Sequence, residues 1–114
     1  MPTDCLFCKI VAGEIPAKLV YQDDHLIAFR DISPVAPTHI LLIPRRHIAS
    51  LADTEPTDRE LLGGLLLAAS ELARDEGLGE GGYRVVTNIG ANAGQSVPHL
   101  HFHLIGGRAM HWVR

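Results

Sequence analysis

The stretch at residues 98–107 reads PHLHFHLIGG, in which three histidines alternate with large apolar residues. Such alternation predicts a β-strand with one face in the core and the histidines in a row on the other face. On the core face we expect Leu100, Phe102 and Leu104, and in the row His99, His101 and His103. Residues two apart on one face lie roughly 6.6 Å apart, so the row spans about 13 Å. A metal held about 2 Å from each ring nitrogen can bind two neighbours of this row but not its two ends, which excludes a site made of all three.

A glycine-rich loop directly precedes the histidine row. It contains Gly90, Gly94 and Ser96, and backbone N–H groups outside regular pairing can converge there on an anion such as phosphate. Neutral imidazole, with an ordinary pKa of about 6.5, is a competent nucleophile near pH 7, and a neighbouring imidazolium or hydroxyl can pass a proton to a leaving group. The glycine-rich loop beside the histidine row therefore favours catalysis at phosphorus. The alternative interpretation is a polar strand face that is rich in histidine without a catalytic role.

Two helices are predicted from the spacing of apolar residues. A short one begins near Leu6 and stops by Gly13. A long one has the capping-box spacing of Thr57 and Glu60 at its start, carries a broad apolar stripe, and ends at Gly77.

Five strands complete the predicted fold. Two flank the Asp23-Asp24 turn within residues 18–31, and the others lie at residues 38–44, 83–88 and 99–105. The sum is an α+β fold, a mostly antiparallel five-stranded sheet with one long and one short helix packed on one side.

Composition limits the class of protein. A chain of 114 residues is long enough for one core, so we expect a single domain over residues 1–114. A formal net charge of −3 argues against binding a nucleic-acid duplex, although a small phosphate ligand stays compatible with it. No basic N-terminal segment precedes a long apolar stretch, so we expect a cytoplasmic protein without a membrane partner.

The pattern His-x-His-x-His-x-x at residues 99–105, with x apolar, resembles the signature of the histidine triad (HIT) superfamily of nucleotide hydrolases and transferases. Three longer stretches resemble its Hint branch, the purine nucleoside phosphoramidases: FRDISPVAPTHILLIPRRHI at 29–48, NIGANAGQSVPHLHFHLIGG at 88–107 and GGRAMHW at 106–112. The last stretch, GGRAMHW, distinguishes the chain from the dinucleoside polyphosphate hydrolase branch of the superfamily. The resemblance runs from Cys5 to Trp112 and implies a HIT-like fold.

The resemblance implies an adenosine 5′-monophosphoramidase-like hydrolase. Such an enzyme cleaves the P–N bond of purine nucleoside 5′-phosphoramidates, among them AMP-amine and AMP-lysine conjugates, and needs no cofactor for the chemistry. His101 would attack the α-phosphorus and form a covalent nucleotidyl-histidine intermediate, which water then hydrolyses. His39 matches a position that orients the nucleophile. The groups expected at the phosphate or leaving group are His103, Ser96, Asn88, Gly94 and Gln95.

The resemblance also implies how the nucleoside and a second subunit would bind. Asp31 matches the acceptor for the ribose hydroxyls, and the apolar slot for the base would consist of Leu6, Phe7, Ile10, Phe29 and Ile32. Proteins of this branch are homodimers in which the two sheets join into one. Their C-terminal tail, here with Trp112, reaches toward the site of the other subunit. This tail ends in Val113-Arg114, unlike those of better-known members.

The two cysteines, Cys5 and Cys8, form a C-x-x-C pair. In a cytosolic protein such a pair is a metal half-site or a redox pair, and the redox form normally follows a strand of a βαβ unit, which is not predicted here. Two free thiols are the third possibility. For a tetrahedral zinc site His47 and His99 are the candidate partners, and the resemblance supports this set. Four protein ligands would leave no open position, so the zinc would be structural.

Three further functions stay open from the sequence. In a metallohydrolase, His99 and His101 would together bind zinc and activate water. A nucleotide-binding or scaffolding module would bind the same ligands with only incidental turnover. A dinucleoside polyphosphate hydrolase would use the same nucleophile on another substrate.

Overall fold

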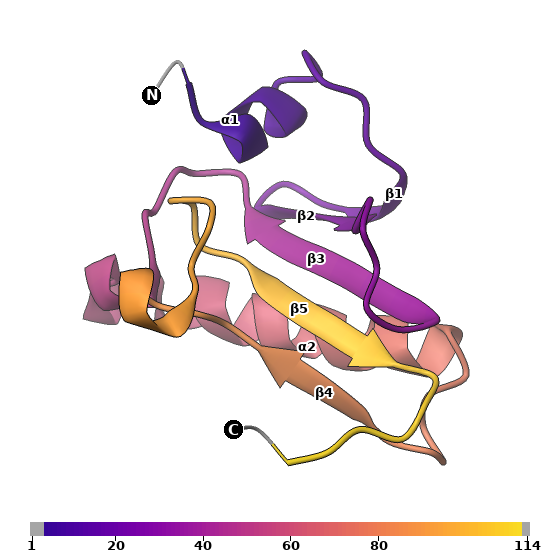
Figure 1. Ribbon diagram of the computed structural model, residues 1–114. Helices are drawn as coiled ribbons and strands as arrows, with labels where there is room; N and C mark the ends of the chain where they lie inside the picture. The colour runs from indigo at the N-terminus through magenta and orange to yellow at the C-terminus, as the bar shows by residue number, and fades with distance from the viewer. Residues whose placement is uncertain (1–3, 113–114) are drawn as a thin grey trace.

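The computed structural model describes residues 4–112 and contains one five-stranded sheet (Figure 1). The strands are β1 (Leu19–Gln22), β2 (Leu26–Arg30), β3 (Thr38–Pro44), β4 (Tyr83–Val86) and β5 (Phe102–Gly106). Their order across the sheet is β1-β2-β3-β5-β4, and every neighbouring pair is antiparallel. The predicted five-stranded antiparallel sheet is confirmed.

The central position of β3 in the sheet explains why its sequence is apolar almost throughout. All seven of its residues are buried, because side chains on both faces of the sheet are covered. Its neighbours β2 and β5 pair with it along their length, with Phe29 opposite Leu41 and His103 opposite Leu41 on the other side. The strand is therefore covered on both faces and paired along both edges.

The helices α1 (Leu6–Val11) and α2 (Arg59–Asp75) cover opposite faces of the sheet. Alternate residues of one strand belong to different cores: Ile40 and Leu42 pack with α2, whereas Leu41 and Ile43 pack with α1. Figure 1 shows α2 crossing behind the strands and α1 above them. The prediction that both helices pack on one side was wrong, because each face of the central strands carries apolar side chains that need cover.

Among the described residues, no helix is long and apolar enough to cross a membrane.

The start of α2 differs from the prediction. A 3-10 turn, η2 (Pro56–Asp58), comes first, and the capping box joins Glu55 and Asp58, not Thr57 and Glu60. The side chain of Asp58 accepts a hydrogen bond from the Glu55 N–H at 2.8 Å, and its pKa is lowered, chiefly by the hydrogen bond from Arg46. At the other end Gly77 has φ +76°, a left-handed conformation that suits glycine, as predicted for the helix end.

The strand predicted over residues 99–105 is shorter in the structure. β5 begins at Phe102, so His99 and His101 precede the regular ladder and only His103 lies within it. The reason is that the Leu100 N–H donates to the Ile48 carbonyl at 2.6 Å, beyond the end of β3, and the preceding His99 N–H turns back to Val97 at 2.8 Å. The alternation nevertheless holds for the core face, since Leu100 is 1%, Phe102 7% and Leu104 0% exposed.

Replacing Leu104 by alanine should destabilise the protein by roughly 2–5 kcal/mol, because it leaves a cavity between the sheet and α2. Urea unfolding followed by circular dichroism measures the change. The control is Val35→Ala in the loop between β2 and β3, where the valine is 56% exposed, and should change stability by no more than about 0.5 kcal/mol. Equal losses in the two variants would contradict the assigned core.

Candidate active site

The ring of His101 is held by a backbone carbonyl. Its Nδ1 lies 2.7 Å from the carbonyl oxygen of His99, and because that oxygen can only accept, Nδ1 must carry the proton. The other nitrogen, Nε2, is then the one with a free lone pair. The residue is 5% exposed and lines a cleft. In the neutral form of His101, Nε2 is thus the nucleophilic nitrogen.

His39 and His103 form a hydrogen-bonded pair whose tautomers follow from their neighbours. The N–H of Val35 donates to Nδ1 of His39 at 3.2 Å, which leaves the proton of His39 on Nε2. That Nε2–H faces Nδ1 of His103 at 2.9 Å and donates to it. The proton of neutral His103 is therefore on its Nε2. His39 contacts His103 and not the expected nucleophile, so the residue that it orients directly is the third histidine of the triad.

The pKa of His103 is lowered to about 4, first by burial and then by the neighbouring rings of His101 and His39, against which Asp31 acts weakly. Protonation at Nδ1 would also place a second proton between His103 and the Nε2–H of His39. Near pH 7 His103 is thus a neutral group whose Nε2–H can donate a hydrogen bond.

A cleft of about 280 Å³ lies beside the histidines. The structure brings to it nine of the expected residues: Leu6, Phe7, Ile10, Phe29, Asp31, Ile32, Ser96, His101 and His103. Its walls are mostly apolar, and its polar groups gather at the histidine end and at Asp31. Sequence reasoning missed six further lining residues, which no motif singled out: Ile15, Pro16, Ala17, Arg30, Leu41 and Val97.

Four other expected nucleotide contacts lie elsewhere. The side chain of Gln95 binds the Gly90 N–H and the carbonyls of Ala49 and Val97, and Asn88 donates to Ala93. The N–H of Gly94 donates within the loop to Ala91, and Trp112 is 86% exposed.

The loop N–H groups are thus used differently from the expected anion cradle. Those of Gly90, Gly94 and Gln95 are satisfied inside the loop, because the chain folds back on itself there. Ser96 is the loop residue that lines the cleft. These hydrogen bonds fix the loop's shape, and with it the place of Ser96.

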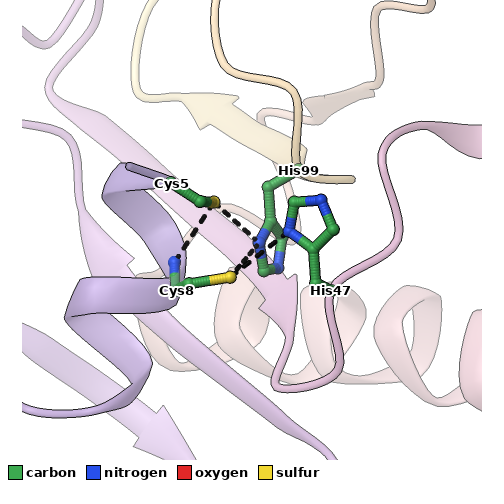
Figure 2. Close-up of side chains that lie close together, drawn as sticks. All are labelled: Cys5, Cys8, His47 and His99. Atoms are coloured by element: carbon green, nitrogen blue, oxygen red, sulfur yellow. Dashed lines mark hydrogen bonds between the residues drawn. The ribbon is translucent and has the colours of Figure 1, made fainter. Parts of the chain in front are cut away.

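A second cluster contains Cys5, Cys8, His47 and His99, whose ligand atoms all lie within 4.8 Å of one another (Figure 2). The Sγ of Cys8 is 3.3 Å from Nδ1 of His47 and 3.6 Å from Nδ1 of His99, and Cys5 Sγ is 3.4 Å from the latter. A tetrahedral zinc with ordinary bond lengths places sulfur and nitrogen ligands roughly 3.6 Å apart. These three sulfur–nitrogen distances therefore match the separation that such an ion requires.

The surroundings of the cluster fit a metal as well. Nε2 of His99 lies 2.9 Å from the Pro44 carbonyl and donates to it, which leaves Nδ1 as the free donor atom. Burial raises the pKa of Cys8 to about 11, helped by Cys5, and burial also lowers the pKa of His99. A bound cation would offset the cost of the thiolates in this buried place. The residues present fit zinc.

A third set of possible ligands, Asp31, His39 and His103, does not fit a metal. The Val35 N–H occupies Nδ1 of His39 as a donor, so the Nε2 that faces the set must keep its proton. A nitrogen that carries a proton has no lone pair for an ion. This set is a hydrogen-bonded chain.

Comparison with known proteins agrees with this geometry. A family model described as "HIT domain" matches residues 12–110. A protein of Escherichia coli named purine nucleoside phosphoramidase is 46% identical over 110 residues, 96% of this chain and 92% of its own. The crystal structure of a HIT family hydrolase from Legionella pneumophila is 54% identical with a TM-score of 0.94 and covers 96% of this chain and 97% of its own. A HIT family hydrolase from Clostridium thermocellum is 42% identical with a TM-score of 0.95, covering 99% and 98%.

The ring of His103 should stay neutral down to about pH 4, with its proton on Nε2, because burial and the donor from His39 oppose the charged form. A pH titration of the histidine ring signals by nuclear magnetic resonance measures both the midpoint and the tautomer. Replacing His39 by phenylalanine removes that donor and should raise the midpoint. A midpoint near 6.5 in the wild type, or a proton on Nδ1, would contradict the assigned hydrogen-bond chain.

Proposed function

The chain belongs to the HIT family of hydrolases, and from this premise we propose that its substrates are purine nucleoside 5′-phosphoramidates, whose P–N bond it cleaves through a nucleotidyl-histidine intermediate. The observation that carries the proposal is the ring of His101, with Nδ1 held by the His99 carbonyl and Nε2 free beside a mostly apolar cleft. The name of the Escherichia coli relative supports the substrate class.

The chemistry proceeds in two steps. Nε2 of His101 attacks the α-phosphorus and forms an N–P bond, the P–N bond to the amine breaks, and the amine takes a proton from solvent. Water then attacks the same phosphorus, the N–P bond breaks, the nucleoside monophosphate leaves, and a proton returns to solvent. Nε2–H of His103 and the hydroxyl of Ser96, which both line the cleft, stabilise the charge on the phosphate oxygens by donating hydrogen bonds.

The nucleoside occupies the rest of the cleft. Leu6, Phe7, Ile10 and Phe29 form apolar walls that suit a purine. Asp31 stands between these walls and His39, with one carboxylate oxygen bound by the Ser33 N–H at 2.7 Å, and its other oxygen can accept from the ribose hydroxyls. Ile32, 98% exposed, forms the rim of the cleft, where an ordered ligand would cover it.

A structural zinc belongs to the proposal. Cys5, Cys8, His47 and His99 would hold it, and its contribution would be to fix α1 against the segment before β5. His101 is outside this set, since its Nδ1 is engaged by a carbonyl, so the chemistry needs no metal. Cys5 and Cys8 form no disulfide, and the reducing conditions of a cytoplasm would keep them available as zinc ligands.

We further propose a homodimer. The outer edge of β4 has no neighbouring strand among the described residues, and an unpaired edge is a template for a second sheet. Large apolar side chains are exposed on α2 at Leu66 and Leu67 and on β4 at Tyr83. The exposed Trp112 lies in the tail that would approach the other subunit's cleft.

Replacing His101 by alanine should lower turnover of adenosine 5′-phosphoramidate by several powers of ten, because it removes the nucleophile. Nucleotide affinity should stay nearly unchanged, since the walls and Asp31 remain. Steady-state kinetics and calorimetric titration with AMP measure the two effects.

The control for this variant is His25→Ala, whose exposed ring lies outside the cleft and should leave the rate within about twofold. Quenched wild-type enzyme should show a nucleotidyl adduct on His101 by mass spectrometry. Retention of more than about a tenth of the activity in His101→Ala would rule out the nucleophile.

Purified protein should carry about one zinc per chain, and Cys8→Ser should lose both the metal and thermal stability, because the ligands come from three separate segments. Elemental analysis and thermal unfolding measure these changes, with His111→Asn, in the exposed tail, as the control. Turnover should fall less than in His101→Ala. Metal-free protein of full stability, prepared under reducing conditions with zinc available, would leave Cys5 and Cys8 as ordinary thiols.

A further inference from the structure

Phe7 lies where the candidate zinc ligands, the proposed nucleophile and the cleft meet. It lies between Cys5 and Cys8 in α1, it is 4% exposed, and its ring contributes to the wall of the cleft. Its ring also stands edge-to-face against His101, with centroids 5.1 Å apart and planes at 85°, and against His99, at 5.9 Å and 73°. The side chain of Phe7 therefore contacts His101, the proposed nucleophile, and His99, one of the four candidate zinc ligands. It also lines the part of the cleft proposed for the base.

Among the described residues, one hydrogen bond restrains the ring of His101, from Nδ1 to the His99 carbonyl. The orientation of the ring plane therefore depends also on the side chains packed against it. Of the two aromatic neighbours, His103 is tilted at 64° and belongs to the phosphate end of the cleft. Phe7 contacts the ring nearly perpendicularly, which is a favoured aromatic geometry. It is the side chain placed to fix the plane of the nucleophile.

Phe29 provides an internal comparison. It lines the same cleft, is likewise 4% exposed and packs edge-to-face on Phe7 at 5.7 Å. The aromatic pairs of the structure include none between Phe29 and His101. The two phenylalanines thus share burial and the cleft wall but differ in contact with the nucleophile.

We propose that Phe7 is a positioning residue that couples occupation of the base slot to the orientation of His101. A purine in the slot holds Phe7 against the imidazole, and the imidazole then presents Nε2 along one line to the phosphorus. Binding of a part of the substrate that does not react is in this way used in the chemical step. This inference rests on the proposed function, because it assumes a base in the cleft and His101 as nucleophile.

The coupling predicts a split between kinetic constants. Phe7→Leu should lower kcat by about ten- to a hundredfold, since small misplacements of a nucleophile carry losses of this order. Phe29→Leu should raise KM and should lower kcat less than Phe7→Leu does, because Phe29 packs on Phe7 whereas Phe7 itself packs on His101. Steady-state kinetics on adenosine 5′-phosphoramidate, with single-turnover formation of the nucleotidyl adduct, measures both.

Phe7→Tyr separates a lost ring from a disturbed fold. It keeps the aromatic contact, so kcat should recover to within about threefold of the wild type. A second measurement uses the histidine ring signals of the unliganded protein, which report geometry without turnover. The His101 signals should shift more in Phe7→Leu than in Phe29→Leu.

A third measurement needs no variant. A ribose 5-phosphoramidate without the base should show a reduced kcat on the wild-type enzyme, and adding free adenine should restore part of it, but not in Phe7→Leu. Equal effects of the two leucine variants on kcat, loss of kcat in Phe7→Tyr, or a baseless substrate with full kcat would each overturn the coupling. Failure of the proposed function is separate, since wild-type enzyme would then not hydrolyse the phosphoramidate at all.

Discussion

The pairing of β3 with β5 is the constraint on which the site depends. Its register sets Leu41 opposite His103 and His39 opposite Ile105, so His39 and His103 are diagonal neighbours on one face. Their rings then meet at 2.9 Å. A slip of one residue would turn His103 into the core and Leu104 into the cleft. The apolar residues of both strands prevent such a slip. The packing that stabilises the sheet therefore also fixes the positions of the histidines in the row.

The histidines share a row in the sequence but have different partners in the structure. His99 faces the cysteines and donates to Pro44, His101 is held by the carbonyl of His99, and His103 accepts from His39. Each partner selects one tautomer and leaves a different nitrogen available. Three chemically identical rings thus obtain three different environments from backbone and neighbouring groups, and these environments are the basis for the separate tasks proposed for them as metal ligand, nucleophile and hydrogen-bond donor.

The short helix α1 carries more function than its length suggests. With six residues it is too short to be stable alone, and its burial against Ile27, Phe29, Leu41 and Ile43 holds it in place. In one turn it provides a cysteine for the metal set and a phenylalanine for the cleft. The cluster of Cys5, Cys8, His47 and His99 and the cleft beside His101 therefore share a wall.

The sequence by itself determined the five strands, the two helices and nine of the fifteen residues that line the cleft, because period-two and helical spacing are local properties and the motif is specific. It also singled out Cys5, Cys8, His47 and His99, which the fold brings within 4.8 Å. Only the tertiary structure decided which face each helix covers, where β5 begins, and that the N–H groups of Gly90 and Gly94 are used within their loop. It alone decided the ring tautomers and the contact of Phe7 with His101, because these depend on hydrogen-bond partners and side chains far apart in the chain.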